Sequence, residues 1–199
     1  NNKELVIEGF VKFIKDQPIT VSVSTSAGFP DLSSIESPIQ SLILDLDSVK
    51  QLKSMIIFPI IMDDIPFGPR VINIYSSTNG QNYIDRGRYN CTSGIDQEYG
   101  EVKVDFRSMI EARFVRIDII DRWQSAMVSI KDVNFIDASE KKVRTKIKGV
   151  SFALIGDNSG YSDFRLIVIL REGENQISVS AQGLNPETAI EQKEEDFKL

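Results

Sequence analysis

Apolar and polar side chains alternate along several short segments of this chain. These segments are residues 20–24, 42–46, 102–106, 113–120 and 164–170. Because successive side chains of a β-strand point to opposite faces, alternation with a period of two predicts strands that bury one face. Turn-forming sequences lie between the runs, as at Asn79-Gly80 and at residues 172–175. Short strands separated by such turns predict an all-β fold, an antiparallel β-sandwich.

Helical periodicity is weak by comparison. No stretch carries apolar residues at helical spacing over three turns, so we expect little helix. Residues 48–51 are the exception and suit a short helical turn. Asp45 and Asp47, just before them, lie two residues apart and share one face of a strand. We expect them to form an acidic row that faces solvent, and a cation site is the alternative.

A change of composition marks the expected domain boundary. Residues 137–148 read DASEKKVRTKIK, a polar and charged stretch between two β-rich regions. A boundary there is one interpretation, and a solvated hairpin within a single domain is the other. The predicted division is residues 1–138 as a β-sandwich, 139–148 as a charged linker or hairpin, 149–185 as a small β module and 186–199 as a charged tail.

Composition removes several classes of function. The 199 residues include no histidine, which is the commonest general base and zinc ligand, and Cys91 is the one cysteine. Acidic residues number 29 and basic residues 23, and this excess argues against a nucleic-acid partner, because phosphate recognition draws on clustered cations. No apolar run reaches the length of a membrane span, and the first residues lack the pattern of a signal peptide. We expect a soluble piece of a longer parent protein.

Four motifs in order resemble a known family. They are residues 44–46 (LDL), 67–83 (FGPRVINIYSSTNGQNY), 112–117 (ARFVRI) and 129–135 (SIKDVNF), with Trp123 before the last. They are similar to motifs of the discoidin-like, galactose-binding β-sandwich family, which includes the C-type domains of coagulation factors V and VIII. The resemblance covers about half of the chain and implies a jelly-roll sandwich with ligand-binding loops at one end.

The resemblance also implies where a ligand would bind. Sugar recognition needs an aromatic plate with charged or amide groups that reach neighbouring hydroxyls. Trp123 and Arg122 lie in a loop between two strands, and Arg70 lies near the ligand rim of the family. The alternative for Trp123 is a plug in the core, and that for Arg70 is an ordinary surface arginine. A further aromatic and basic cluster contains Tyr83, Arg88 and Tyr89, which the solvated end of a hairpin explains equally well.

Two further expectations depend on resemblance. Asp132 matches a family glutamate that commonly supplies a carboxylate to structural calcium, although residues 27–38 lack the Asp-Gly pair and tryptophan of the usual calcium loop. We expect calcium as the one cofactor, at Asp132. Residues 170–181 resemble a hairpin of bacterial immunoglobulin-like modules, which act as spacers in secreted and surface proteins.

The sequence gives little support to a catalytic function. Asp63 and Asp64 form the obvious pair of carboxylates, but adjacent residues of a strand point to opposite faces and would not converge on one bond. We therefore expect no enzyme.

The sequence favours a non-catalytic ligand-binding module of a larger protein, located outside the cell or at its surface. Carbohydrate is the favoured ligand, bound through loops at one end of the sandwich, and neither nucleic acid nor direct membrane insertion is expected. The alternative is a structural or protein-interaction module for assembly or adhesion, without sugar binding. Partners would then be a glycan or a surface protein, together with other domains of the parent chain.

Overall fold

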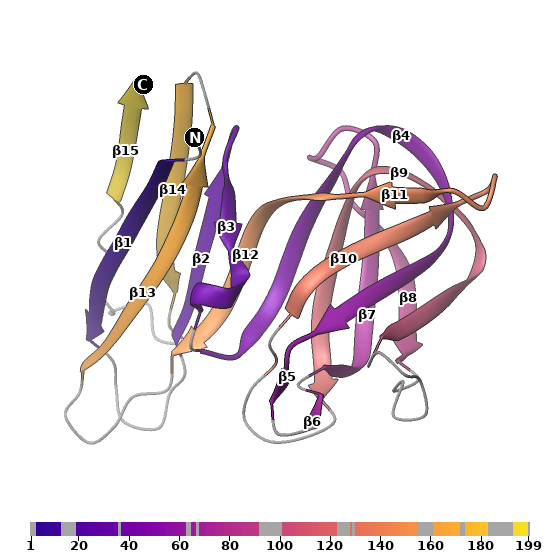
Figure 1. Ribbon diagram of the computed structural model, residues 1–199, viewed down its shortest axis with the longest axis horizontal. Helices are drawn as coiled ribbons and strands as arrows, with labels where there is room; N and C mark the ends of the chain where they lie inside the picture. Colours follow the sequence, from indigo (N-terminus) through magenta and orange to yellow (C-terminus); the bar gives the residue numbers. More distant parts are fainter. Residues whose placement is uncertain are drawn as a thin grey trace. The chain divides into compact units, whose positions relative to one another are not determined.

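The computed structural model describes residues 3–12, 19–35, 37–62, 65–66, 68–91, 101–122, 128, 130–154, 161–171, 174–182 and 193–198. Its contacts divide the chain into two compact units. One unit is Asn1–Gln40 together with Lys148–Leu199, and the other is Ser41–Ile147. The strands of both are labelled in Figure 1. We call them the split unit and the central unit.

The split unit is built from two antiparallel sheets. Its elements are β1 (Lys3–Lys12), β2 (Ile19–Thr25), β3 (Phe29–Asp31), the 3-10 turn η1 (Leu32–Ser34), β12 (Lys146–Leu154), β13 (Tyr161–Leu170), β14 (Glu174–Gln182) and β15 (Lys193–Lys198). One sheet has the order β1-β13-β3, and the other has the order β15-β14-β2-β12. Val21 and Val23 of β2, Phe152 of β12 and Leu166 of β13 are buried in its core, as the alternation of their strands predicts.

The central unit contains the two longest strands. Its elements are β4 (Ile39–Pro59), β5 (Ile61–Met62), β6 (Ile65–Pro66), β7 (Pro69–Ser77), β8 (Ile84–Asn90), β9 (Val102–Arg122), β10 (Ile130–Asp137) and β11 (Lys142–Arg144). The first half of β4 pairs with the second half of β9, and the second half of β4 pairs with the first half of β9. The long strands therefore form one bent, hydrogen-bonded sheet, and we call its two halves the front sheet and the back sheet.

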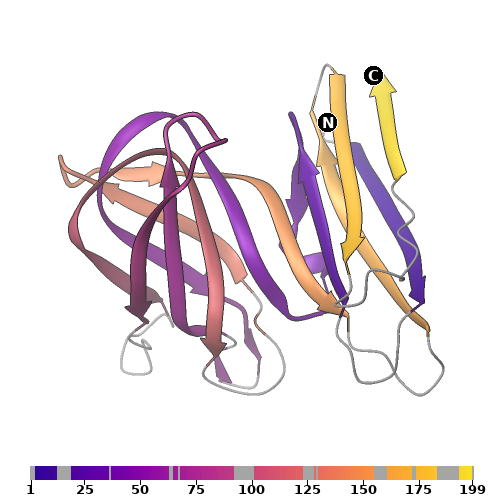
Figure 2. The same ribbon diagram turned by 180° about the vertical axis from the view of Figure 1, so that it is seen from behind.

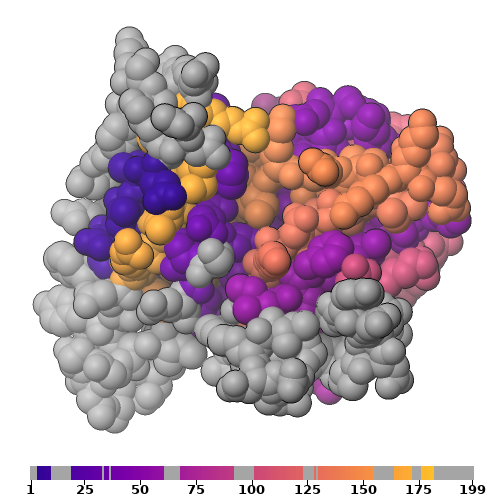
Figure 3. All heavy atoms as spheres, in the orientation of Figure 1, coloured from indigo at the N-terminus to yellow at the C-terminus, as the bar shows by residue number. Residues whose placement is uncertain are grey.

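The two halves of this bent sheet share β4 and β9 but have different neighbours. The front sheet has β10 beside the second half of β4, with β11 beside β10 (Figure 1). Side chains of β10 and β11 lie on the face seen in Figure 3. The back sheet has β7 beside the second half of β9, with β8 beside β7. These strands lie nearer the viewer in Figure 2.

Apolar side chains of both sheets form the core of the central unit. Fully buried positions include Leu42, Leu44, Ile57, Ile72, Ile74, Val115, Val133 and Phe135. All strand pairs described are antiparallel, which confirms the predicted all-β antiparallel fold. Among the described residues, no helix is long and apolar enough to cross a membrane.

The structure differs from the sequence-based interpretation of residues 45–51. These residues belong to β4, where the register against β9 shifts between Asp45 and Lys50 and Asp47 has a φ of 65°. The expected helical turn is a bulge that bends the strand. Asp45 does not face solvent either, since it is only 4% exposed and pairs with Arg113. Asp47 is exposed and pairs with Lys146.

The grouping of segments also differs from the predicted division. Residues 1–40 belong with the C-terminal residues because β1 pairs with β13, and β2 pairs with both β12 and β14. Between β10 and β11, residues 137–141 form a turn closed by the Asp137 amide, which donates to the Lys141 carbonyl at 3.0 Å. The charged residues 193–198 form β15 on β14. Backbone pairing at a sheet edge does not need alternating apolar side chains.

The division predicts which fragments fold. A fragment of residues 41–147 contains its own two sheets and core, and we expect a dispersed amide NMR spectrum and a cooperative thermal transition. A fragment of residues 149–185 lacks β1 and β2, so β13 and β12 lose strands to which they are hydrogen-bonded, and the sheets that remain are too small to be stable alone. We expect that fragment to remain unfolded. A folded 149–185 fragment would contradict the division.

Cys91 provides a second check on the core of the central unit. It lies directly after β8, is 2% exposed and donates its backbone N–H to the Arg70 carbonyl at 2.8 Å. Burial raises the pKa of the Cys91 thiol to about 12, so the thiolate is scarce at pH 8. We expect iodoacetamide to leave the native protein unmodified at pH 8 and to modify it fully in denaturant. Rapid native alkylation would contradict this placement.

Candidate functional site

The outer face of the back sheet carries a polar and aromatic cluster. Ile72 and Ile74 of β7 and Ile117 of β9 point into the core, so the residues between them point outward. The strand register places Asn73 opposite Asp118 and Tyr75 opposite Arg116. These four side chains lie on neighbouring strands and on the same face.

Arg116 is at the centre of the cluster. Its guanidinium carbon lies 4.0 Å from the ring centroid of Tyr75 and 5.7 Å from that of Tyr83, within the range of cation–π attraction. Its Nη2 donates to Asp118 Oδ2 at 3.3 Å. Its Nε is buried and lies 3.2 Å from Asp118 Oδ1 without the alignment of a hydrogen bond. We call Asn73, Tyr75, Tyr83, Arg116 and Asp118 the Arg116 patch.

Tyr83 reaches the patch through the loop between β7 and β8. Ser77 Oγ accepts the Gly80 amide at 2.9 Å, and Asn79 Oδ1 accepts the amides of Gln81 and Asn82 at 2.9 and 3.0 Å. Gly80 has a φ of 78°, and a Cβ atom there would lie 3.3 Å from the Phe114 ring. The loop is thus folded closely onto the outer face of the sheet.

The patch is half-buried, and this affects its acid–base chemistry. The side chains of Arg116 and Asp118 are 35% and 30% exposed. Burial raises the pKa of the Asp118 carboxyl, and the neighbouring Arg116 partly offsets this rise. Burial likewise raises the pKa of Tyr83, so its phenol stays neutral at physiological pH. The patch therefore presents a held guanidinium, a carboxylate, an amide and an aromatic ring at a partly dry surface.

The carboxylate of Asp121 joins Arg70 to the end of β9. Arg70 Nε donates to Asp121 Oδ2 at 2.8 Å, and Asp121 Oδ1 accepts the Arg122 amide at 2.8 Å. The hydrogen bond from Arg70 holds the pKa of the Asp121 carboxyl below its usual range. Trp123, the expected sugar plate beside them, lies outside the described residues. The structure therefore brings Arg70 and Arg122 together through Asp121.

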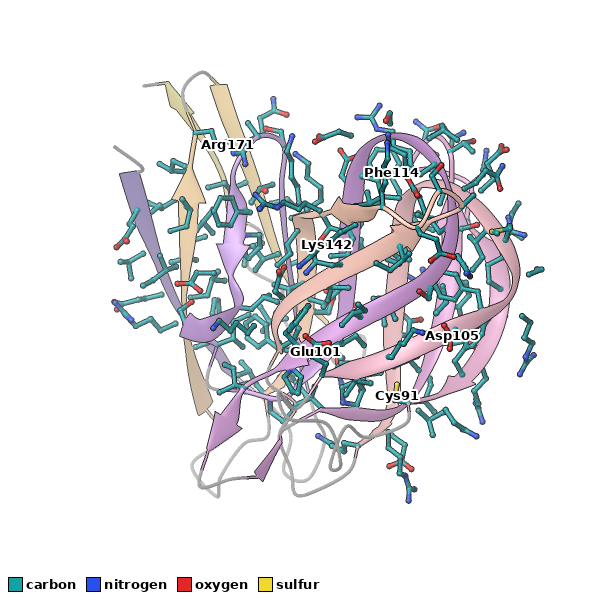
Figure 4. The ribbon with its side chains drawn as sticks, turned by 45° about the vertical axis from the view of Figure 1, so that its right-hand side comes forward. Cys91, Glu101, Asp105, Phe114, Lys142 and Arg171 are labelled. Atoms are coloured by element: carbon teal, nitrogen blue, oxygen red, sulfur yellow. The ribbon has the colours of Figure 1, made fainter. Side chains whose placement is uncertain are left out.

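The Arg70–Asp121 pair and the Arg116 patch are at different places on the back sheet. The Arg70 carbonyl accepts a hydrogen bond from the Cys91 amide, and Gly80 of the Tyr83 loop lies so close to Phe114 that an added Cβ would be 3.3 Å from its ring. Cys91 and Phe114 lie at opposite ends of the central unit in Figure 4. A ligand at the loops near Arg70 and a ligand on the patch would thus occupy separate sites.

The predicted cluster on β8 divides between surface and core. Tyr83 joins the patch, and Arg88 is exposed and lies opposite Asn73 in the register. Tyr89 is only 7% exposed and packs edge-on against Phe106, with ring centroids 5.8 Å apart. Tyr89 therefore stabilises the core.

Asp132 is placed at the start of β10. Its Oδ1 accepts the Val133 amide at 2.9 Å, and its Oδ2 accepts the Asn134 side-chain amide at 2.8 Å. Within the described part of the chain, no three acidic, histidine or cysteine residues gather closely enough to hold a metal ion. Calcium binding at Asp132 stays a prediction. Asp63 and Asp64, the acidic pair considered for catalysis, lie outside the described residues.

Asn73, Tyr75, Arg116 and Asp118 are not among the site residues predicted from the sequence. Arg116 and Asp118 were visible there as the polar positions of an alternating strand. The pairing of β7 with β9 sets them beside Asn73 and Tyr75, which are more than 40 residues away in the chain. The sequence feature that could have identified the patch is the occurrence of arginine, tyrosine and asparagine at outward positions of strands predicted to be neighbours.

Comparisons with known proteins leave the family undecided. No protein-family model and no curated protein sequence matches the chain. Among solved structures, the C-terminal domain of a chitobiase from Bacteroides fragilis is similar, with 18% sequence identity and a TM-score of 0.37. The match covers 54% of this chain, and the chain spans 63% of that domain's length. A match at this TM-score supports no conclusion about function, and the discoidin-like family stays a prediction.

Gly80→Ala tests whether the Tyr83 loop depends on the conformation of Gly80. A side chain at positive φ costs about 1–2 kcal/mol, and the added Cβ also crowds Phe114. We expect a loss of about that size in the free energy of unfolding, measured with denaturant. Gly68→Ala is the matched control, since a Cβ there makes only ordinary contacts with Pro59 and Val102, at 3.5 Å. Equal losses in both variants would contradict the loop assignment.

Proposed function

We propose that this chain is a non-catalytic carbohydrate-binding module of a larger secreted or surface protein, and that sugar binds at the Arg116 patch. The observation that carries the proposal is Arg116 held between Tyr75, Tyr83 and Asp118 on the outer, half-buried face of the back sheet. The motifs similar to galactose-binding sandwiches support the same class of ligand.

The patch has the chemical groups that sugar recognition uses. A guanidinium donates to hydroxyl oxygens in a fixed fork, while a carboxylate and an amide oxygen accept hydroxyl protons. Aromatic rings cover the apolar C–H face of a sugar. Asn73, Tyr83, Arg116 and Asp118 supply one group of each kind. No single strand contains all of them, which is why the sheet is needed to assemble the site.

The patch is also ordered in advance of binding. Stacking on Tyr75 and pairing with Asp118 restrict the rotamers of Arg116, so less side-chain entropy is lost when a ligand binds. Sugars offer little apolar surface to bury, so the free energy gained on binding is small. A patch that is already ordered loses less entropy and can therefore bind a sugar more readily.

The nearby carboxylates support a binding role over a catalytic one. Asp118 is held by Arg116, and Asp85 Oδ1 accepts the Gly87 amide at 2.7 Å and the Asn73 side-chain amide at 3.3 Å. Each carboxylate thus has a structural partner. Reversible capture would raise the local concentration of the parent protein on its glycan.

A glycan-array screen of the whole chain, with calcium and with chelator, followed by calorimetry on the best ligand, tests the proposal. Arg116→Met and Tyr83→Ala should each weaken binding by roughly 10-fold or more, as expected for loss of a charged hydrogen bond or an aromatic contact. Arg144→Met, on β11 of the front sheet, is the matched control and should bind normally. Thermal melting of each variant separates lost binding from lost folding.

Arg70→Met distinguishes the two locations. It removes the partner of Asp121 at the far end of the sheet and leaves the Arg116 patch intact. Loss of binding in Arg70→Met with normal binding in Arg116→Met would move the site to the loops near Arg70. A folded chain that binds no glycan and forms oligomers at micromolar concentration would instead favour the protein-interaction module.

A further inference from the structure

We propose that the Arg116 patch selects an uncharged sugar ring over an acidic one. This inference rests on the proposed function and adds the class of sugar. The proposal is based on the charged side chains that neighbouring strands place near the patch.

Both carboxylates and guanidinium groups surround the patch. Asp118 of β9 pairs with Arg116, and Asp45 of β4 pairs with Arg113, whose Nε lies 3.2 Å from Asp45 Oδ1. Asp85 and Arg88 of β8 lie opposite Tyr75 and Asn73 in the register. Among the described residues, the carboxylates of Asp45, Asp85 and Asp118 thus lie beside the guanidinium groups of Arg88, Arg113 and Arg116, while Arg86 of β8 donates to Ser76 Oγ at 2.7 Å.

The carboxylates are close enough to act on a ligand. Burial is the main cause of the raised pKa of Asp118 and of Tyr83, and the charges of Asp85 and Asp45 respectively add to these rises. Both carboxylates thus lie within electrostatic reach of the patch, in addition to Asp118 itself. A uronic acid approaching Arg116 would meet this negative charge and would compete with Asp118 for the same guanidinium.

A neutral ring avoids that competition. Arg116 has five N–H donors, of which the hydrogen bond to Asp118 uses one at Nη2. The carboxylate of Asp118 has further lone pairs that accept a hydroxyl proton. Adjacent hydroxyls of a sugar can thus receive a donor from Arg116 and an acceptor from Asp118 without breaking the ion pair. The half-buried position strengthens both bonds.

The experiment measures matched neutral and acidic sugars on the whole chain. The probes are the methyl glycosides of glucose and galactose with the corresponding glucuronide and galacturonide, titrated by NMR at low and high sodium chloride. We expect the neutral member of the pair that binds to bind roughly 10-fold more tightly, which corresponds to about 1.4 kcal/mol. Its Kd should change little with salt, since no net charge is exchanged. Tighter binding of the uronide, weakened by salt, would overturn the inference and leave carbohydrate binding standing.

Asp118→Asn gives a second, sharper readout. It keeps the shape of the side chain but leaves Arg116 uncompensated, so the preference should shift toward the uronide by roughly 10-fold. Asp105→Asn, on the front-sheet half of the same strand, is the matched control and should leave the preference unchanged. An unchanged preference in Asp118→Asn would overturn the inference. Failure of every neutral and acidic probe to bind the folded wild-type chain would overturn both the inference and the proposed function.

Discussion

The central unit depends on the buried carboxylate of Asp45. This side chain is 4% exposed, accepts the Asp47 amide at 2.8 Å and pairs with Arg113. The two contacts fix the bulge at which β4 leaves one sheet and enters the other, and the positive φ of Asp47 lies inside that bulge. A buried charge without partners is strongly unfavourable, so the pair also makes the bend a single, defined conformation. The register of the back sheet, with Asp45 opposite Phe114, starts at this point, and a second shift between Leu52 and Ser54 precedes the pairing of the front sheet.

The register set at the bend places the Arg116 patch. Counting along β9 from Phe114, which lies opposite Asp45, puts Arg116 and Asp118 at successive outward positions. A register shift of one residue would point these side chains into the core and Ile117 into solvent. The same pairing brings Tyr75 and Asn73 of β7 beside them. The chemistry of the outer face and the packing of the inner face thus follow from one alignment of strands.

Local pattern predicted the strands well but not their partners. The alternation at residues 113–120 identified the inward residues Val115 and Ile117 correctly, because burial of one face is a local constraint. The pairing of β2 with β12 and β14 joins residues far apart in the chain, and no local signal indicated it. Asp45 was expected at the surface, because a carboxylate is usually exposed unless a distant residue pairs with it, and Arg113 is that residue. The Arg116 patch could not be predicted for the same reason, because its residues come together only through the pairing of β7 with β9.

The central claim is that ligand binds on the outer face of the back sheet. Mapping backbone amide shifts by NMR, during titration of the whole chain with the neutral sugar that binds best, tests it most directly. Binding at the Arg116 patch should give the largest shifts in residues 73–75, 83–85 and 116–118. Shifts concentrated at Arg70, Asp121 and Arg122, with residues 116–118 unchanged, would contradict it.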